Sequence, residues 1–220
     1  MDILIYLYLA MFVFAAVGFT FGAVRYLRPH KPLYASMITL GIGTAMIGKA
    51  YTMLRLLTGL QVTDVFHVGA LGAVGAFAFF FSANFGQIDS LVDGGEKKFM
   101  KYRVLSVAGI LVTALLSIPI ILSGADISEK ITDLITAAVI AAASYYHVKH
   151  ILIPDVDYGV VKCLRLYNTT ALIYGILCML EMTALSNRMD ILLITACLLE
   201  GIASAALIVF MDRGVREWSK

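Results

Sequence analysis

Long apolar runs alternate with short polar gaps along the whole chain. The runs cover about residues 3–25, 33–58, 65–87, 104–123, 130–152, 161–184 and 190–212. Each is long enough for a helix, which rises about 1.5 Å per residue, to cross a hydrocarbon core about 30 Å thick. None shows the two-residue alternation of a membrane β-strand, and a helix satisfies its own backbone groups in lipid. The pattern predicts an all-α integral membrane protein, a bundle of seven transmembrane helices.

The positions of the basic residues predict how this bundle is threaded. Thirteen of the 17 lysines and arginines lie in or beside every second gap, or in the tail. They are Arg25, Arg28, Lys31, Lys97, Lys98, Lys101, Arg103, Lys149, Lys162, Arg165, Arg213, Arg216 and Lys220. Because cytoplasmic loops retain lysine and arginine, this alternation places the N-terminus outside and the C-terminus in the cytoplasm. No basic segment precedes the first run, so we expect it to be a membrane span and not a cleaved signal.

Composition leaves little room for any other domain. Hydrophobic residues make up 60% of the chain and charged residues 15%, against about 25% charged in soluble proteins. We therefore expect residues 1–220 to form a single transmembrane domain, a multi-pass protein of the cell membrane whose main partner is the lipid bilayer. The net charge of +2 is sorted by side, which gives no support for nucleic-acid binding.

Small residues recur inside the runs at helical spacing. Gly69, Gly72 and Gly75 lie in the third run, and Gly18 and Gly22 in the first. Helices in lipid associate by close approach of their backbones, so these residues predict surfaces that face other helices, with the third helix central. A narrow permeation path along the third-run glycines is the alternative interpretation.

A shift of 126 residues suggests an internal repeat. It places Asp64 on Asp190, Ala70 on Ala196 and Gly75 on Gly201 without a gap. The same shift lays the first three runs over the last three, with the fourth as a linker. Both halves then have the same orientation, which predicts a 3+1+3 parallel repeat.

Lys49 is the basic residue that topology explains least. It lies about 16 residues into the second run, beyond the midplane, and Glu200 lies near the centre of the seventh. A charge at such depth costs a few kcal/mol unless it is paired or solvated. Both residues fall within about one helical turn of the same depth. We predict a Lys49–Glu200 contact, direct or through water; a purely structural ion pair is the alternative.

Further polar groups lie toward the outside of this pair. His67, near the start of the third run, is the group most able to titrate near neutral pH. Tyr174, Cys178 and Glu181 share one face of the sixth run by their spacing. With Arg55 and Asp64, these groups predict a polar vestibule open to the outside. The expected ligand-binding residues are Lys49, Glu200, His67, Glu181, Tyr174 and Arg55.

No pattern in the chain indicates catalytic, metal or cofactor chemistry. His147 and His150 share a helix face, but no acidic residue completes a metal motif with them. A haem needs two histidines at one depth, and His67 lies at the opposite end from that pair. Microbial rhodopsins and small sugar transporters also have seven spans, but the seventh run holds Glu200 instead of a retinal-binding lysine, and the Pro-Gln signature of the sugar transporters is absent. We expect no cofactor and no metal.

These observations favour a small membrane carrier or binding protein for a polar or ionisable small solute or ion, with its site among the second, third, sixth and seventh helices. The alternative is a membrane sensor or assembly subunit whose inner loops and tail contact a cytoplasmic protein or a second copy of the chain. An intramembrane enzyme or a haem protein is a minor alternative, because no nucleophile–base motif is present.

Overall fold

Seven long helical spans build the protein. The computed structural model of the chain describes residues 2–62, 67–154 and 159–218. Five spans are single helices, and two include short additional segments. The elements are α1 (Asp2–Tyr26), α2 (Leu33–Leu57), α3 (Ala70–Ala83), the π-helical η1 (Asn84–Asp89), α4 (Ser90–Val92), the 3₁₀ turn η2 (Lys97–Phe99), α5 (Met100–Leu122), α6 (Ile127–Leu152), α7 (Val160–Ser186) and α8 (Asp190–Trp218). In the described residues all regular structure is helical, and seven spans are apolar and long enough to cross a membrane, as the sequence predicts.

The third span differs from its expected bounds. Helix α3 begins at Ala70 instead of residue 65, and His67 lies in the non-helical segment before it. The expected starting residues 65 and 66, and Asp64 with them, lie outside the described residues. At its other end the span continues through η1 and α4 to Val92. The polar stretch 88–103, expected to be a loop, is therefore mostly helical, with a turn at 93–96 where Gly94 and Gly95 adopt positive φ values of 52° and 81°.

The C-terminal segment is also helical, so the last span continues past Asp212, where the sequence predicts the start of a short tail. Helix α8 continues to Trp218. Gly214 lies against the Cys163 carbonyl, where an added Cβ would come within 2.6 Å of the oxygen. Val215 is buried, and Trp218 packs against the core. Packing on α7 thus holds this segment in the bundle.

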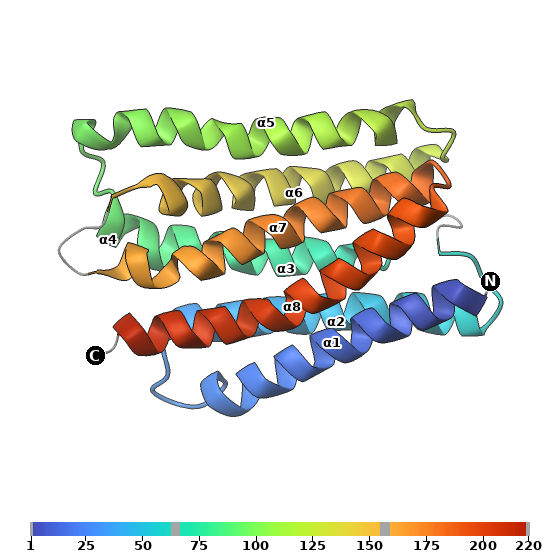
Figure 1. The fold of residues 1–220 in the computed structure, drawn as a ribbon, viewed down its shortest axis with the longest axis horizontal. Helices are drawn as coiled ribbons and strands as arrows, with labels where there is room; N and C mark the ends of the chain where they lie inside the picture. Colours follow the sequence, from blue (N-terminus) through green and yellow to red (C-terminus); the bar gives the residue numbers. More distant parts are fainter. Residues whose placement is uncertain (1, 63–66, 155–158, 219–220) are drawn as a thin grey trace.

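The helices form a closed ring with one helix outside it. Contacts run from α1 to α2, α3, α6, α7, α8 and back to α1, while α5 lies at one edge against α6 and α7 (Figure 1). Successive helices alternate in direction. The end that holds the C-terminus is called the basic end below, and the end that holds the N-terminus is called the hollow end. Helix α7, with 61% of its span buried, is more enclosed than α3 with 33%, so α7 and not α3 is central.

Small residues make the closest helix contacts. A Cβ added to Gly72 would lie 2.7 Å from the Cα atom of Gly48, and one on Gly18 would lie 3.3 Å from the Ser204 carbonyl. Helix α3 therefore packs directly on α2, and α1 on α8, as predicted from the glycine spacing. Because α2 backbone fills the space beside the α3 glycines, the alternative of a permeation path along them is wrong for this structure.

Candidate functional site

A buried lysine held by two carboxylates lies inside the helix ring. Lys49 Nζ on α2 is 2.6 Å from Glu181 Oε2 on α7 and 2.9 Å from Glu200 Oε1 on α8. Tyr8 on α1 donates a hydrogen bond of 2.7 Å to the other oxygen of Glu181. We call Lys49, Glu181 and Glu200 the buried triad. It includes the expected Lys49–Glu200 contact, and together with Tyr8 it brings one polar side chain from each of four helices.

The buried triad carries more acid than base. One lysine faces two carboxylates, so the three groups carry a net charge of −1 when all are ionised. Glu181 is 4% exposed and Glu200 1%, and Glu200 Oε2 has no hydrogen-bond partner among the described residues. Buried charges are costly unless they are paired and hydrogen-bonded. Because Glu200 Oε2 has no partner and the buried triad has a net charge of −1, the triad can accept a proton, a cation or a polar ligand.

Two small cavities flank Lys49. One, of about 20 Å³, is lined by Tyr8, Lys49, His67 and Glu181 among others. The other, of about 10 Å³, lies between Lys49, Glu200 and the Tyr174 side of α7. A space of about 10–15 Å³ is the least that holds a water molecule. The buried triad is thus closed in this structure, with room for water or an ion on the His67 side.

His67 joins this cavity to a second polar group. Its Nδ1 lies 3.0 Å from Asp133 Oδ1 on α6, and both side chains are buried. The Ser186 hydroxyl on α7 donates to Glu129 at 3.2 Å and has a longer contact of 3.4 Å to Asp133 Oδ2. We call His67, Asp133, Ser186 and Glu129 the outer polar chain. It lies between the buried triad and the hollow end.

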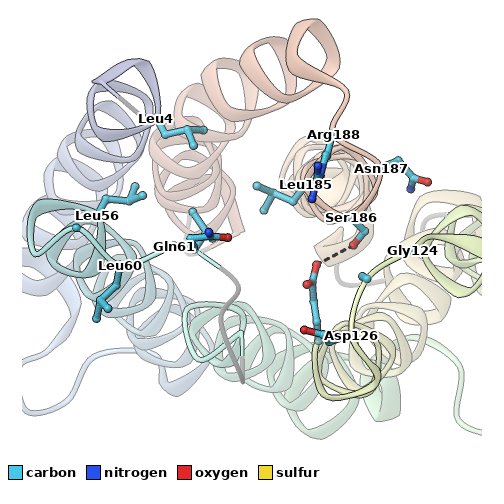
Figure 2. Close-up of a pocket in the computed structure, with 14 residues that line it drawn as sticks. Leu4, Leu56, Leu60, Gln61, Gly124, Asp126, Leu185, Ser186, Asn187 and Arg188 are labelled. Carbon is cyan, nitrogen blue, oxygen red and sulfur yellow. Dashed lines mark hydrogen bonds between the residues drawn. The ribbon is translucent and has the colours of Figure 1, made fainter.

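A large hollow opens at the hollow end of the bundle. Its volume is about 760 Å³. Figure 2 shows Leu4, Leu56, Gln61 and Leu185 around its opening, with Ser186 beside its carboxylate acceptor. The lining also includes Glu129, but among the described residues neither Lys49 nor Glu181 reaches it. None of the described residues expected to line a polar vestibule lines this hollow, and Asp64 lies outside the described residues, so the vestibule stays a prediction.

Aromatic rings close the bundle on the other side of the buried triad. Tyr174 stacks on Phe77 with ring centroids 5.4 Å apart, and Phe77 meets Phe80 edge-on at the same distance. Phe80 in turn contacts Tyr167. Phe77, Phe80, Tyr167 and Tyr174 are each at most 1% exposed. This aromatic layer separates the buried triad from the polar groups of the basic end.

Beyond the aromatic layer, His147 is held by two amides. Its Nδ1 lies 2.9 Å from Asn168 Oδ1 and 3.0 Å from Asn84 Nδ2. His150 lies near Asp89, 3.5 Å from Nε2 to Oδ1. Among the described residues, no three histidines, cysteines or acids are placed to hold a metal ion together. His147 and His150 therefore contact different side chains, the first two amides and the second a carboxylate.

Ion pairs tie the helices together at the basic end. Lys149 on α6 is 2.6 Å from Asp89 and 2.5 Å from Asp93. Arg103 on α5 also donates to Asp93, and this hydrogen bond lowers the pKa of the Asp93 carboxyl to about 2. Asp212 on α8 binds Arg25 at 2.7 Å, with further contacts from Tyr26 and Arg216. Buried acids therefore partly neutralise the lysines and arginines that gather at the basic end.

The structure brings most of the predicted site residues together. Lys49, Glu181 and Glu200 are in contact, and Tyr174 lines the smaller cavity beside Glu200. His67 lines the larger cavity. Arg55 is apart, because its Nε donates to the Gln61 carbonyl at 3.1 Å in the loop that follows α2.

Sequence reasoning missed four residues of this region: Tyr8, Glu129, Asp133 and Ser186. Tyr8 lies in an apolar run, where its hydroxyl is the one feature that points to a polar contact. Glu129 and Asp133 do carry a signal in the sequence, because they are acids one helical turn apart at the start of a span and so lie on one face of α6. What pairs them with His67 is the contact of α3 with α6, which the spacing of the spans does not reveal.

In comparisons with protein-family models, with curated proteins and with solved structures, nothing matches this chain.

Proposed function

We propose that the protein is a small membrane carrier or binding protein for a polar or ionisable small solute, and that the buried triad is its binding site. One observation carries this proposal: a buried lysine shared by two carboxylates, with one carboxylate oxygen left without a partner. Ionisable residues inside a membrane bundle are rare and commonly mark substrate or ion paths. Lys49 then attracts an anionic group or balances the carboxylates, and Glu200 Oε2 accepts a hydrogen bond or proton from the solute.

The hollow is the proposed entrance. It gives a solute a space of about 760 Å³ at one end, whereas the cavities beside Lys49 hold about one water molecule. A solute larger than water reaches the buried triad only when helices at the hollow end separate. The structure then corresponds to a closed state of the carrier, with the aromatic layer as the barrier toward the basic end.

For topology, the proposal places the N-terminus and the hollow outside the cell and the basic end in the cytoplasm, with the cell membrane as the location. The distribution of lysine and arginine supports this orientation. The proposal also includes a 3+1+3 parallel repeat. The ring order supports it, because α1–α2–α3 and α6–α7–α8 make equivalent neighbour contacts while α5 stays outside.

A variant without charge in the buried triad separates a binding role from a structural one. In Lys49→Met/Glu181→Gln/Glu200→Gln the three side chains keep their size but lose all charge. Replacing a complete buried ion pair by uncharged residues is often neutral for stability, whereas Lys49→Ala alone leaves two carboxylates unpaired and costs about 3–5 kcal/mol. We expect the uncharged variant to unfold near the wild-type temperature in detergent and Lys49→Ala to unfold well below it.

The functional measurement is uptake into proteoliposomes of a panel of small carboxylates, amines and amino acids, followed by mass spectrometry. We expect the wild type to take up at least one compound, and the uncharged variant to lose about tenfold or more of that uptake, the effect of about 1.4 kcal/mol in binding. The matched control, Arg213→Met/Glu217→Gln, removes an exposed ion pair of α8 and should transport normally. Equal uptake by the folded uncharged variant would make the buried triad a structural contact.

A further inference from the structure

The hollow and the buried triad are connected by side chains and not by open space. Among the described residues, no residue lines both the hollow and either cavity beside Lys49. The outer polar chain spans this gap: Glu129 and Ser186 line the hollow, Ser186 contacts Asp133, and Asp133 binds His67, which lines the larger cavity. Such a connection excludes a solute but lets a proton pass from group to group.

We propose that the buried triad binds a proton at its Glu181–Glu200 carboxylates, and that the outer polar chain conducts this proton between the triad and the hollow. The role of the proton as a coupling ion rests on the proposed carrier function. Its binding does not, because it follows from the charge and hydrogen bonds of the triad alone.

The charge of the site supports one proton. With Lys49 charged and both carboxylates ionised, one added proton makes the buried triad neutral, and Glu200 Oε2 is the oxygen without a partner. The other ionisable groups near the carboxylates are uncharged in their ordinary forms or already counted. They are Tyr8 on α1, Lys49 on α2, His67 before α3, Tyr174 and Cys178 on α7, and Cys197 on α8. A buried site of net charge −1 is costly, so proton uptake is favoured.

Each step of the path is a transfer of one proton between neighbours. A proton from water in the hollow reaches Glu129 and passes by way of the Ser186 hydroxyl to Asp133. Asp133 gives it to His67 Nδ1, while the other ring nitrogen releases a proton to water in the cavity of about 20 Å³. That water protonates Glu181 or Glu200. Histidine suits the middle position, because its neutral ring holds one donor and one acceptor nitrogen.

Among the described residues, the path leads from the buried triad to the hollow and ends at the aromatic layer on the other side. Beyond the buried triad, the stacked rings of Tyr174 and Phe77 and the adjoining Phe80 and Tyr167 form the aromatic layer, which offers no comparable series of acids and bases. Proton exchange therefore occurs from the hollow end. A carrier that closes the hollow end and opens the aromatic layer would release the same proton at the basic end.

Infrared difference spectroscopy of the purified protein in liposomes tests binding directly. After a step from alkaline to acidic pH, a buried carboxylic acid gives its own C=O stretching band. We expect this band in the wild type, its loss or shift in Glu181→Gln and Glu200→Gln, and no change in Glu96→Gln, which removes an exposed glutamate. Glu200→Asp, which keeps a carboxyl group, should retain a shifted band and serves if Glu200→Gln does not fold.

The kinetics of the same band test the path. We expect His67→Gln and Asp133→Asn to reach the wild-type band amplitude about tenfold or more slowly after the pH step, because a positioned proton-transfer group speeds transfer by about 10² or more. Far-ultraviolet circular dichroism establishes that each variant is folded.

Two results would overturn the inference. A band that persists in both glutamine variants would place the proton elsewhere, and unchanged kinetics in the folded His67 and Asp133 variants would remove the path. Both results leave the uptake assay of the carrier untouched. Conversely, a protein that takes up no solute but shows the band in its wild-type form alone would keep the proton site and lose the carrier.

Discussion

At the scale of single residues, buried acids and bases are matched differently in different parts of the molecule. Asp212 contacts two arginines, Arg25 and Arg216, so positive charge is in excess there. Asp93 contacts Arg103 and Lys149, and Lys149 also contacts Asp89, so two acids face two bases there. In the buried triad the ratio is reversed, with one lysine for two carboxylates. A structural ion pair needs no excess acid, so this reversed ratio supports the proposal that the buried triad is a binding site.

The ion pair between Asp93 and Arg103 predicts how the stability of the protein depends on pH. The hydrogen bond from Arg103 lowers the pKa of Asp93 in the folded protein to about 2, below the ordinary value of about 3.9. The pKa of Asp93 is lower in the folded protein than in the unfolded one. The ion pair with Arg103 therefore stabilises the fold fully at pH values above about 3.9, and this stabilisation is lost as the pH falls toward 2. Asp93→Asn should therefore unfold at a lower temperature than wild type at neutral pH, with a difference that shrinks between about pH 4 and pH 2.

Thermal unfolding in detergent at a series of pH values measures this difference. Glu96→Gln is the matched control, because its pairing partner Lys98 and Glu96 itself are both exposed. Exposed ion pairs contribute little to stability, so this variant should follow the wild type at every pH. A difference between Asp93→Asn and wild type that stays constant down to pH 2 would show that the Asp93 carboxylate is not the titrating group.

At the scale of elements, the contact between α2 and α3 fixes the site. Lys49 follows Gly48 directly, and Gly48 lies against Gly69 and Gly72, so backbone contact sets how Lys49 is turned toward α7 and α8. Gly69 also lies two residues after His67. Close approach of these two helices therefore positions both the buried triad and the inner end of the outer polar chain.

Enlarging a glycine at this contact should separate the helices. In Gly72→Ala the new Cβ would lie 2.7 Å from both the Gly48 Cα atom and the Thr44 carbonyl, and backbone atoms do not move aside as a side chain can. We expect a loss of about 1–3 kcal/mol in unfolding free energy, the usual effect of overpacking. Gly86→Ala in the same span is the control, because nothing lies within 4 Å of its added Cβ. Unfolding of both variants in detergent measures the contrast, and equal stabilities would refute close packing as the cause.

Much of the element scale could be predicted from the sequence, and the limits are physical. Apolar length predicts spans, and counting residues from their ends gives depth, which is why Lys49 and Glu200 were matched. Depth says nothing of rotation about the helix axis or of which helices adjoin. The contact of Glu181 with Lys49, although closer than that of Glu200, and the pairing of His67 with Asp133 both depend on those neighbours. The helical continuation of α8 to Trp218 depends on packing against α7, and the polar composition of the segment after Asp212 gives no sign of this packing.

At the scale of the whole molecule, the two ends of the bundle differ in how firmly helices are joined. At the basic end, ion pairs link α1 with α8 through Arg25 and Asp212, and α6 with η1 of the third span through Lys149 and Asp89. The hollow end encloses a space of about 760 Å³ instead (Figure 2). Under the proposed carrier function, the helices at the hollow end are the ones that separate.

The same difference makes the orientation of the molecule testable. The excess of lysine and arginine predicts that the basic end faces the cytoplasm. Met189, in the turn between α7 and α8 at the hollow end, and Glu96, in the turn before α5 at the basic end, are both exposed, so a cysteine at either position should not disturb folding. A membrane-impermeant maleimide added to intact cells should label Met189→Cys at once and Glu96→Cys only after permeabilisation. The unmodified chain gives the background from Cys163, Cys178 and Cys197. The reverse order of labelling would invert the topology and place the hollow, with its outer polar chain, on the cytoplasmic side.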